Sequence, residues 1–153
     1  MQWFAVTNEQ LKLHMRDSDF NLISIFLTKV EDKEKKCGSH SLTVEERVVS
    51  LIWGASGIIE NGGFQYFYEQ EFDAEAVATA YEKIGCNKCA ELLRLSRSLF
   101  PDQIFRAGLS ERIQFIEHNS AAFYNLSNAF WEADEEMQKR LADYIKMNRR
   151  VRE

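Results

Sequence analysis

The sequence is poor in residues that interrupt helices and in residues that build covalent or metal frameworks. It has 153 residues with only one proline and seven glycines, so long helices meet few obligatory breaks. Its three cysteines are an odd number, which argues against a disulfide framework. No apolar run approaches the roughly 20 residues that span a bilayer, and the first residues lack the features of a signal peptide. We therefore expect a cytoplasmic protein that makes no contact with a membrane.

Strong positive charge is also missing. The net charge is −5, whereas a nucleic-acid binder needs clustered lysine and arginine to displace counterions from phosphates. We therefore expect no direct contact with nucleic acid. Apolar residues make up 45% of the chain, which is sufficient for a packed core, and the length predicts a single domain over residues 1–153.

Apolar residues recur at three- and four-residue spacing along most of the chain, which predicts helices. No segment alternates apolar and polar residues convincingly, so we expect an all-α fold of six to eight helices without a sheet. The expected helices cover residues 8–15, 19–35, 44–61, 74–84 and 87–99, with further helices from Ser110 and from Asn119 onward. Residues 64–70 are expected to form a short aromatic helix or a turn. Pro101 ends one helix, and residues 101–108 are expected to form a loop. The pattern leaves open whether residues 120–150 form one bent helix or two.

Several positions carry local signals for helix ends. Thr43 and Glu46 have the spacing of a capping box, and Asp73 can cap the helix over 74–84. We expect Asn61-Gly62 to end the helix over 44–61, with glycine in the left-handed conformation of a C-cap. Further expected caps are Asp17, Ser18, Ser110 and Asp134. Within the helix over 44–61, Gly54 and Gly57 indicate close packing against a neighbour.

Few residues suggest catalysis. Cys86 and Cys89 have redox spacing at a helix start, but a helix precedes them where a redox motif would follow a strand. A structural zinc site would need four ligands, conceivably Cys37, Cys86, Cys89 and His118. The phosphate-binding, hydrolase and metalloprotease motifs are missing. We therefore expect that the protein is not an enzyme and binds no cofactor or metal. A thiol- or zinc-dependent enzyme is the least favoured alternative.

The negative charge is concentrated in two stretches. From residue 60 to residue 82 there is no lysine or arginine, and a second acidic stretch covers residues 132–136. By contrast, most of the charged residues in 137–153 are basic. Two acidic faces are thus candidates for contacting a basic partner. The candidate partner-binding residues are Glu60, Glu69, Glu71, Asp73, Glu75, Glu132, Asp134, Glu135 and Glu136.

The segment after the expected helix over 44–61 carries a recognisable signature. Its residues are Asn61, Gly62, Gly63, Phe64, Gln65, Tyr66 and Phe67. We interpret this signature as structural: the glycines permit a sharp reversal, Asn61 and Gln65 can bond freed backbone groups, and Phe64 and Phe67 reach the core. The alternative is that the signature forms a pocket or a contact with a partner.

The signature resembles that of the bacterial DNA-mimic protein nineteen-like family, a domain of unknown function. The resemblance extends to Ala80–Cys86, Phe123-Tyr124 and Tyr144–Lys146, and it covers roughly residues 40–150. It implies an all-α fold, a homodimer, and carboxylates that occupy the DNA-binding surface of a transcription factor. This chain is less acidic than such mimicry requires, and its C-terminus is basic.

Together these observations predict a non-enzymatic interaction module. Its acidic face would bind a basic protein partner, and DNA mimicry against a DNA-binding regulator is the form that the resemblance implies. An immunity- or antitoxin-type binder is the alternative, because modest acidity is sufficient for such a role.

Overall fold

The computed structural model describes residues 8–150, with side chains placed for residues 16–149. Eight α-helices and two short 3-10 helices make up this part of the chain, and it contains no strand. The helices are α1 (Asn8–Cys37), α2 (Val44–Tyr68), α3 (Ala74–Lys83), α4 (Asn87–Ser98), α5 (Asp102–Ala107), α6 (Leu109–His118), α7 (Ser120–Ala133) and α8 (Met137–Arg150), with η1 (Ser39–Ser41) and η2 (Asp134–Glu136) between them. The predicted all-α fold is confirmed.

Two of the predicted helix starts have the expected caps. The Thr43 hydroxyl accepts from the backbone N–H of Glu46 at 3.2 Å, and the Glu46 carboxylate accepts from the Thr43 N–H at 3.0 Å. Asp73 accepts from the N–H groups of Glu75 and Ala76 at the start of α3. Residues 120–150 form two helices, α7 and α8, which η2 separates.

Three local predictions are wrong. Residues 8–37 form one continuous helix where we expected a break before Asp17 and Ser18. Contacts with α8 support this stretch, because Gln138 donates to the Arg16 carbonyl at 2.8 Å and Lys146 lies 3.6 Å from Asp19. Residues 101–108 contain α5 where a loop was expected. Ser110 lies inside α6, whose N-cap position is Gly108.

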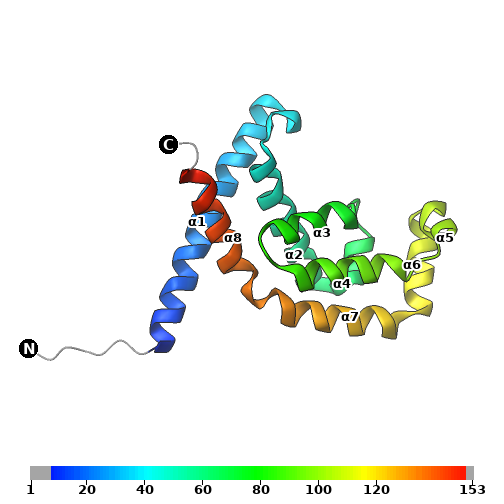
Figure 1. Ribbon diagram of the computed structural model, residues 1–153. Helices are drawn as coiled ribbons and strands as arrows, with labels where there is room; N and C mark the ends of the chain where they lie inside the picture. Colours follow the sequence, from blue (N-terminus) through cyan, green and yellow to red (C-terminus); the bar gives the residue numbers. More distant parts are fainter. Residues whose placement is uncertain (1–7, 151–153) are drawn as a thin grey trace, which may run out of the picture.

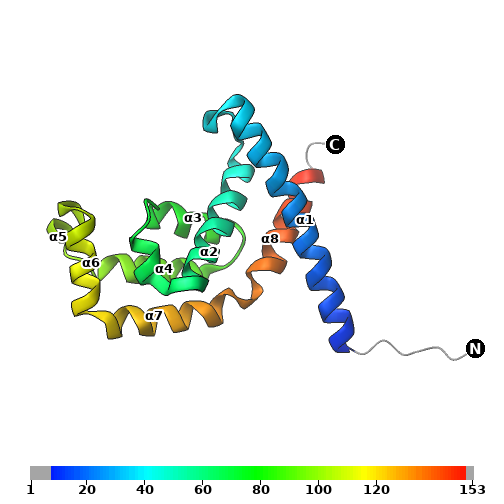
Figure 2. The ribbon, with the colours of Figure 1, turned by 180° about the vertical axis from the view of Figure 1, so that it is seen from behind.

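The helices are arranged around α2. In Figures 1 and 2, α1 and α8 lie side by side at one end of the molecule, and the beginning of α1 extends past the other helices. The remaining helices gather around the second half of α2, with α5 and α6 at the opposite end. A continuous core joins buried residues of α2, α3, α4, α7 and α8, whereas α1 buries only Ile23 and Val30 among its described side chains.

Aromatic rings fill the core between α2, α4 and α7. The centre of the Tyr68 ring lies 4.9 Å from that of Phe100 and 6.3 Å from that of Phe123. The ring centres of Phe64 and Phe130 are 5.4 Å apart. These rings meet mostly edge to face, which is a favourable arrangement of their quadrupoles. The apolar spacing of residues 87–99 also predicts a buried Leu95, but this side chain of α4 is 44% exposed. No helix of the described residues is long and apolar enough to cross a membrane.

Candidate functional site

The signature forms a kink inside α2. Helical hydrogen bonding continues on both sides of Gly63, but Gly63 itself has φ +68° and ψ −167°, far from helical values. This conformation is almost restricted to glycine. The predicted helix end at Asn61-Gly62 is therefore wrong. The chain changes direction at Gly63, and it does not end there but continues as a helix to Tyr68.

Helix α7 supplies partners for the backbone groups that the kink frees. The N–H of Phe64 donates to the Ser127 hydroxyl at 2.9 Å, and the carbonyl of Ile59 accepts from the Trp131 indole at 2.9 Å. We expected Asn61 and Gln65 to provide such bonds, but these two bonds come from side chains 63 and 72 positions away in sequence. Phe64 and Phe67 are both fully buried, as expected.

The two glycines after Asn61 have different surroundings. A Cβ on Gly63 would lie 2.7 Å from both the Ser127 hydroxyl and the Gln65 side-chain oxygen. A Cβ on Gly62 would lie 2.9 Å from Cγ of Tyr66, so the absence of a side chain there makes room for the Tyr66 ring. Close packing therefore explains why Gly62 and Gly63 have no side chain. It does not explain Gly57, where an added Cβ would meet no atom within 4 Å. The expected close packing at Gly57 is therefore wrong.

Asp134 is buried, contrary to its predicted place on an acidic surface. It is 6% exposed and accepts from Ser56 at 2.6 Å and from Tyr81 at 3.2 Å, with the Cys89 thiol at 3.8 Å. Burial raises the pKa of Asp134 to about 6, and these hydrogen bonds oppose the rise. The carboxylate thus links α2, α3, α4 and η2 from within, and it is not available to a partner.

Three more of the predicted partner-binding carboxylates already have partners within the chain. Glu75 binds Arg94 at 2.9 Å, and hydrogen bonds from this guanidinium lower the pKa of Glu75. Asp73 caps α3, and Glu136 lies 3.2 Å from Arg140. Arg94 also pairs with Glu82, so a single arginine of α4 is shared by two carboxylates of α3. The negative charge on the α3–α4 side of the predicted acidic face is therefore reduced but not cancelled.

The other five predicted carboxylates are exposed and make no ion pair within the described part of the chain. They are Glu60, Glu69, Glu71, Glu132 and Glu135. Glu60 and Glu69 lie on the second half of α2 and at its end, and Glu132 and Glu135 lie at the end of α7 and in η2. The fold packs α2 against α7, so acidic groups separated by more than sixty residues in sequence belong to neighbouring elements.

The packing of α2 on α7 brings together two segments that lack positive charge. Residues 48–82 and 113–138 contain no lysine or arginine. The first segment includes most of α2 and all of α3 except its last residue, Lys83, and the second includes all of α7. The sequence already showed that residues 60–82 lack cations, but the absence over 113–138 was a signal that the sequence-based interpretation missed.

A cleft of about 320 Å³ opens beside the acidic segment, between the end of α2 and α5. Its lining includes Glu71 together with Arg97, Arg112 and Phe105. The Arg97 guanidinium lies 3.6 Å from the centre of the Phe105 ring, and Arg112 donates to the Tyr68 and Phe105 carbonyls. Arg97 thus connects α4 to α5, and Arg112 connects α6 to α2 and α5.

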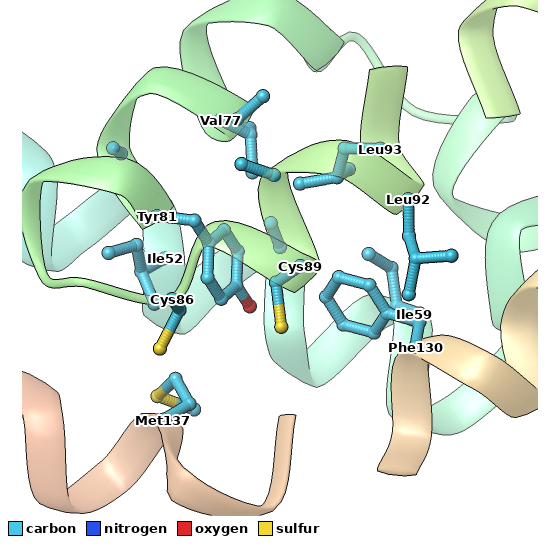
Figure 3. Close-up of a cluster of buried hydrophobic side chains, with 14 of the residues drawn as sticks. Ile52, Ile59, Val77, Tyr81, Cys86, Cys89, Leu92, Leu93, Phe130 and Met137 are labelled. Carbon is cyan, nitrogen blue, oxygen red and sulfur yellow. The ribbon is translucent and has the colours of Figure 1, made fainter. Parts of the chain in front are cut away.

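Cys86 and Cys89 lie in the core. In Figure 3 the Cys86 side chain points toward Met137, and Cys89 lies between Tyr81 and Phe130. Burial raises the pKa of the Cys86 thiol to about 11 and raises that of Cys89 further. Because the thiolate is the reactive form, the geometry offers no support for redox chemistry at this pair. Among the side chains of residues 16–149 there is no group of three potential metal ligands.

Comparison with known proteins gives one match. The family model described as DMP19-like protein matches residues 40–148, which include every described element from α2 to α7 and most of α8. This confirms the resemblance that the signature suggested and agrees with the expected extent of about 40–150. No curated protein and no solved structure matches the chain.

Proposed function

This chain belongs to the DMP19-like protein family, and from that premise we propose that it is a non-enzymatic interaction protein whose acidic face binds a basic protein. The observation that carries the proposal is the packing of α2 against α7, two helices whose neighbouring segments lack lysine and arginine. We name the surface formed by Glu60, Glu69, Glu132 and Glu135 the α2–α7 face.

The α2–α7 face differs from the acidic surface that the sequence predicted. Asp134 is buried, and Glu75 and Glu136 each pair with an arginine, so these three contribute less net negative charge toward a partner. Asp73 is exposed and keeps its charge, but its carboxylate also caps α3. The remaining carboxylates are exposed and have no cation paired with them among residues 16–149. Unpaired exposed carboxylates attract positive charge over about one Debye length, roughly 10 Å at moderate salt.

A DNA-binding regulator is a partner of the required chemistry. Its nucleic-acid surface carries the lysine and arginine that would otherwise contact phosphates. A surface of spaced carboxylates without interspersed cations is complementary to that surface, and such complementarity mainly speeds association and selects partners. This argument supports DNA mimicry on the α2–α7 face.

The test compares two charge-reversed variants of equal net charge. Glu60→Lys/Glu69→Lys/Glu132→Lys changes the α2–α7 face, and Glu31→Lys/Asp32→Lys/Glu34→Lys changes exposed residues of α1. None of these carboxylates caps a helix or is buried, so both variants should fold, which circular dichroism checks. Asp73 is left intact because its reversal would remove the α3 cap.

Each protein is used to capture partners from a cell extract at low and at high salt, followed by quantitative mass spectrometry. We expect basic DNA-binding proteins to bind the wild type and the α1 variant at low salt and to be lost with the α2–α7 variant. DNA fragments should compete for the same partners. Equal recovery by the two variants would contradict the proposed face.

A further inference from the structure

Exposed aromatic rings accompany the carboxylates of the α2–α7 face. Tyr66 is 40% exposed, Tyr124 57% and Trp131 36%, whereas most aromatic side chains of this protein are in the core. Among the side chains of residues 16–149, Phe20 on α1 is the other aromatic side chain with comparable exposure. Large exposed rings lose contact with water when a partner covers them, and aromatic residues are enriched at interfaces.

Helical spacing and hydrogen bonds place these rings beside the kink. Tyr124, Ser127 and Trp131 follow the i, i+3, i+7 pattern, so they share one flank of α7. Ser127 and Trp131 both bond the backbone of α2, which shows that this flank faces α2 at the kink. Tyr66 belongs to the short helical segment after the kink, and its ring packs over Gly62. The aromatic rings thus border the seam between α2 and α7.

Carboxylates flank the same seam. The Trp131 indole bonds the Ile59 carbonyl, and the residues that follow each of them in the chain are Glu60 and Glu132. Both glutamates are exposed, and neither has an ion-pair partner within the described side chains. We call the set of Tyr66, Tyr124, Trp131, Glu60 and Glu132 the aromatic seam.

We propose that the aromatic seam binds arginine side chains of the partner and discriminates against lysine. This inference rests on the proposed function, since it names the residue type that the acidic face selects. A guanidinium is planar and weakly hydrated, so it can stack on a tyrosine or tryptophan ring while it donates to a neighbouring carboxylate. A lysine ammonium is compact and strongly hydrated, and it gains less from the same rings.

The test uses two fluorescent peptides of equal length and charge. In the first, arginines alternate with glycines, and in the second, lysine replaces each arginine. Their affinities are measured by fluorescence anisotropy for the wild type and for Tyr66→Ala/Tyr124→Ala. We expect the wild type to bind the arginine peptide more tightly. The tyrosine variant should lose about tenfold in affinity for the arginine peptide, because it lacks two of the rings on which a guanidinium can stack. Its affinity for the lysine peptide should change little.

Two matched controls separate this inference from the proposed function. Leu95→Ala/Leu109→Ala removes two exposed apolar side chains from α4 and α6 and should leave both affinities unchanged. Glu60→Gln/Glu132→Gln should weaken binding of both peptides, whereas Glu31→Gln/Asp32→Asn on α1 should not.

The outcomes are distinct. If the wild type binds both peptides equally and the tyrosine variant behaves like it, arginine selection is wrong, while a loss on Glu60→Gln/Glu132→Gln still supports the acidic face. If those glutamate changes affect neither peptide, the proposed face itself is contradicted. A second copy of this chain is the other molecule that could cover the aromatic seam, and light scattering tests for it. If Tyr66→Ala/Tyr124→Ala has a lower molecular mass in solution than the wild type, the seam is a contact between two copies, which would overturn the inference.

Discussion

Gly63 combines a left-handed φ with close neighbours, and these two constraints act on the same Cα. Its φ of +68° and ψ of −167° lie where L-residues with side chains are strained. A Cβ would also lie 2.7 Å from the Ser127 hydroxyl, the group that accepts from the Phe64 N–H. A side chain at this position would therefore disturb both the backbone and the bond that secures the kink to α7.

We predict that Gly63→Ala lowers the free energy of unfolding by at least about 2 kcal/mol, since strained conformations alone cost about 1–3 kcal/mol. Gly57→Ala in the same helix is the matched control. Gly57 has an ordinary φ and an open Cβ position, so alanine there should add about 0.5–1 kcal/mol through helix propensity. Chemical denaturation of the two variants measures the difference. A small effect at Gly63 would show that the kink is not required for the fold.

At the scale of elements, the junction between α7 and α8 depends on a buried carboxylate. Asp134 begins η2 and is hydrogen-bonded to Ser56 of α2 and Tyr81 of α3. Burial and the nearby charge of Glu60 raise its pKa to about 6 from 3.8, so the folded state binds this proton more tightly than the unfolded chain does. Ionised Asp134 therefore reduces stability at neutral pH, although its hydrogen bonds position three helices.

The sign of this effect gives a pH dependence. Lowering the pH from about 6 to about 4 should make Asp134 stabilise the fold by about 2 kcal/mol, and raising the pH through its folded pKa should remove that contribution. Asp134→Asn lacks this titration but can accept from Tyr81 and donate to Ser56. The difference in unfolding free energy between the wild type and Asp134→Asn, followed by denaturation from pH 4 to pH 7, should shift accordingly. A constant difference would contradict the raised pKa.

At the scale of the whole molecule, α1 lies entirely outside the family match and packs against the C-terminal helix. Residues 40–148 match the family, whereas α1 ends at Cys37. Its contacts with α8 bring together segments more than one hundred residues apart, as the bond between Gln138 and the Arg16 carbonyl shows. We infer that α1 supports α8 and the first half of α2, at the end of the molecule away from α5 and α6 (Figure 1).

Two isoleucines on α1 test this role. Ile23 is fully buried and Ile25 is 55% exposed. Ile23→Ala should lower the free energy of unfolding by about 3 kcal/mol, within the usual range for deleting a buried aliphatic side chain. Ile25→Ala should change it by less than about 0.5 kcal/mol. Thermal and chemical denaturation measure both. Similar effects at the two positions would mean that α1 does not pack as described.

Local sequence patterns predicted most of the helices because capping and helical periodicity depend on residues within one or two turns. Thr43 with Glu46, Asp73, and Pro101 after α4 are signals of this kind, and the structure has helix ends at each of them. The kink was assigned one residue early and taken for a helix end. Its position depends on Ser127 and Trp131, which lie far away in the sequence and bond the backbone there.

The sequence by itself determined the helical class, the family and the overall acidity, since these follow from composition, periodicity and a short signature. Only the tertiary structure decided which carboxylates face outward. Asp134 is buried because α2, α3 and η2 meet around it, and Glu75 is paired with a cation because α4 brings Arg94 beside it. Packing between α2 and α7 joins two cation-free segments that the chain keeps apart. Charge is a property of residues, but a charged surface depends on which helices pack together.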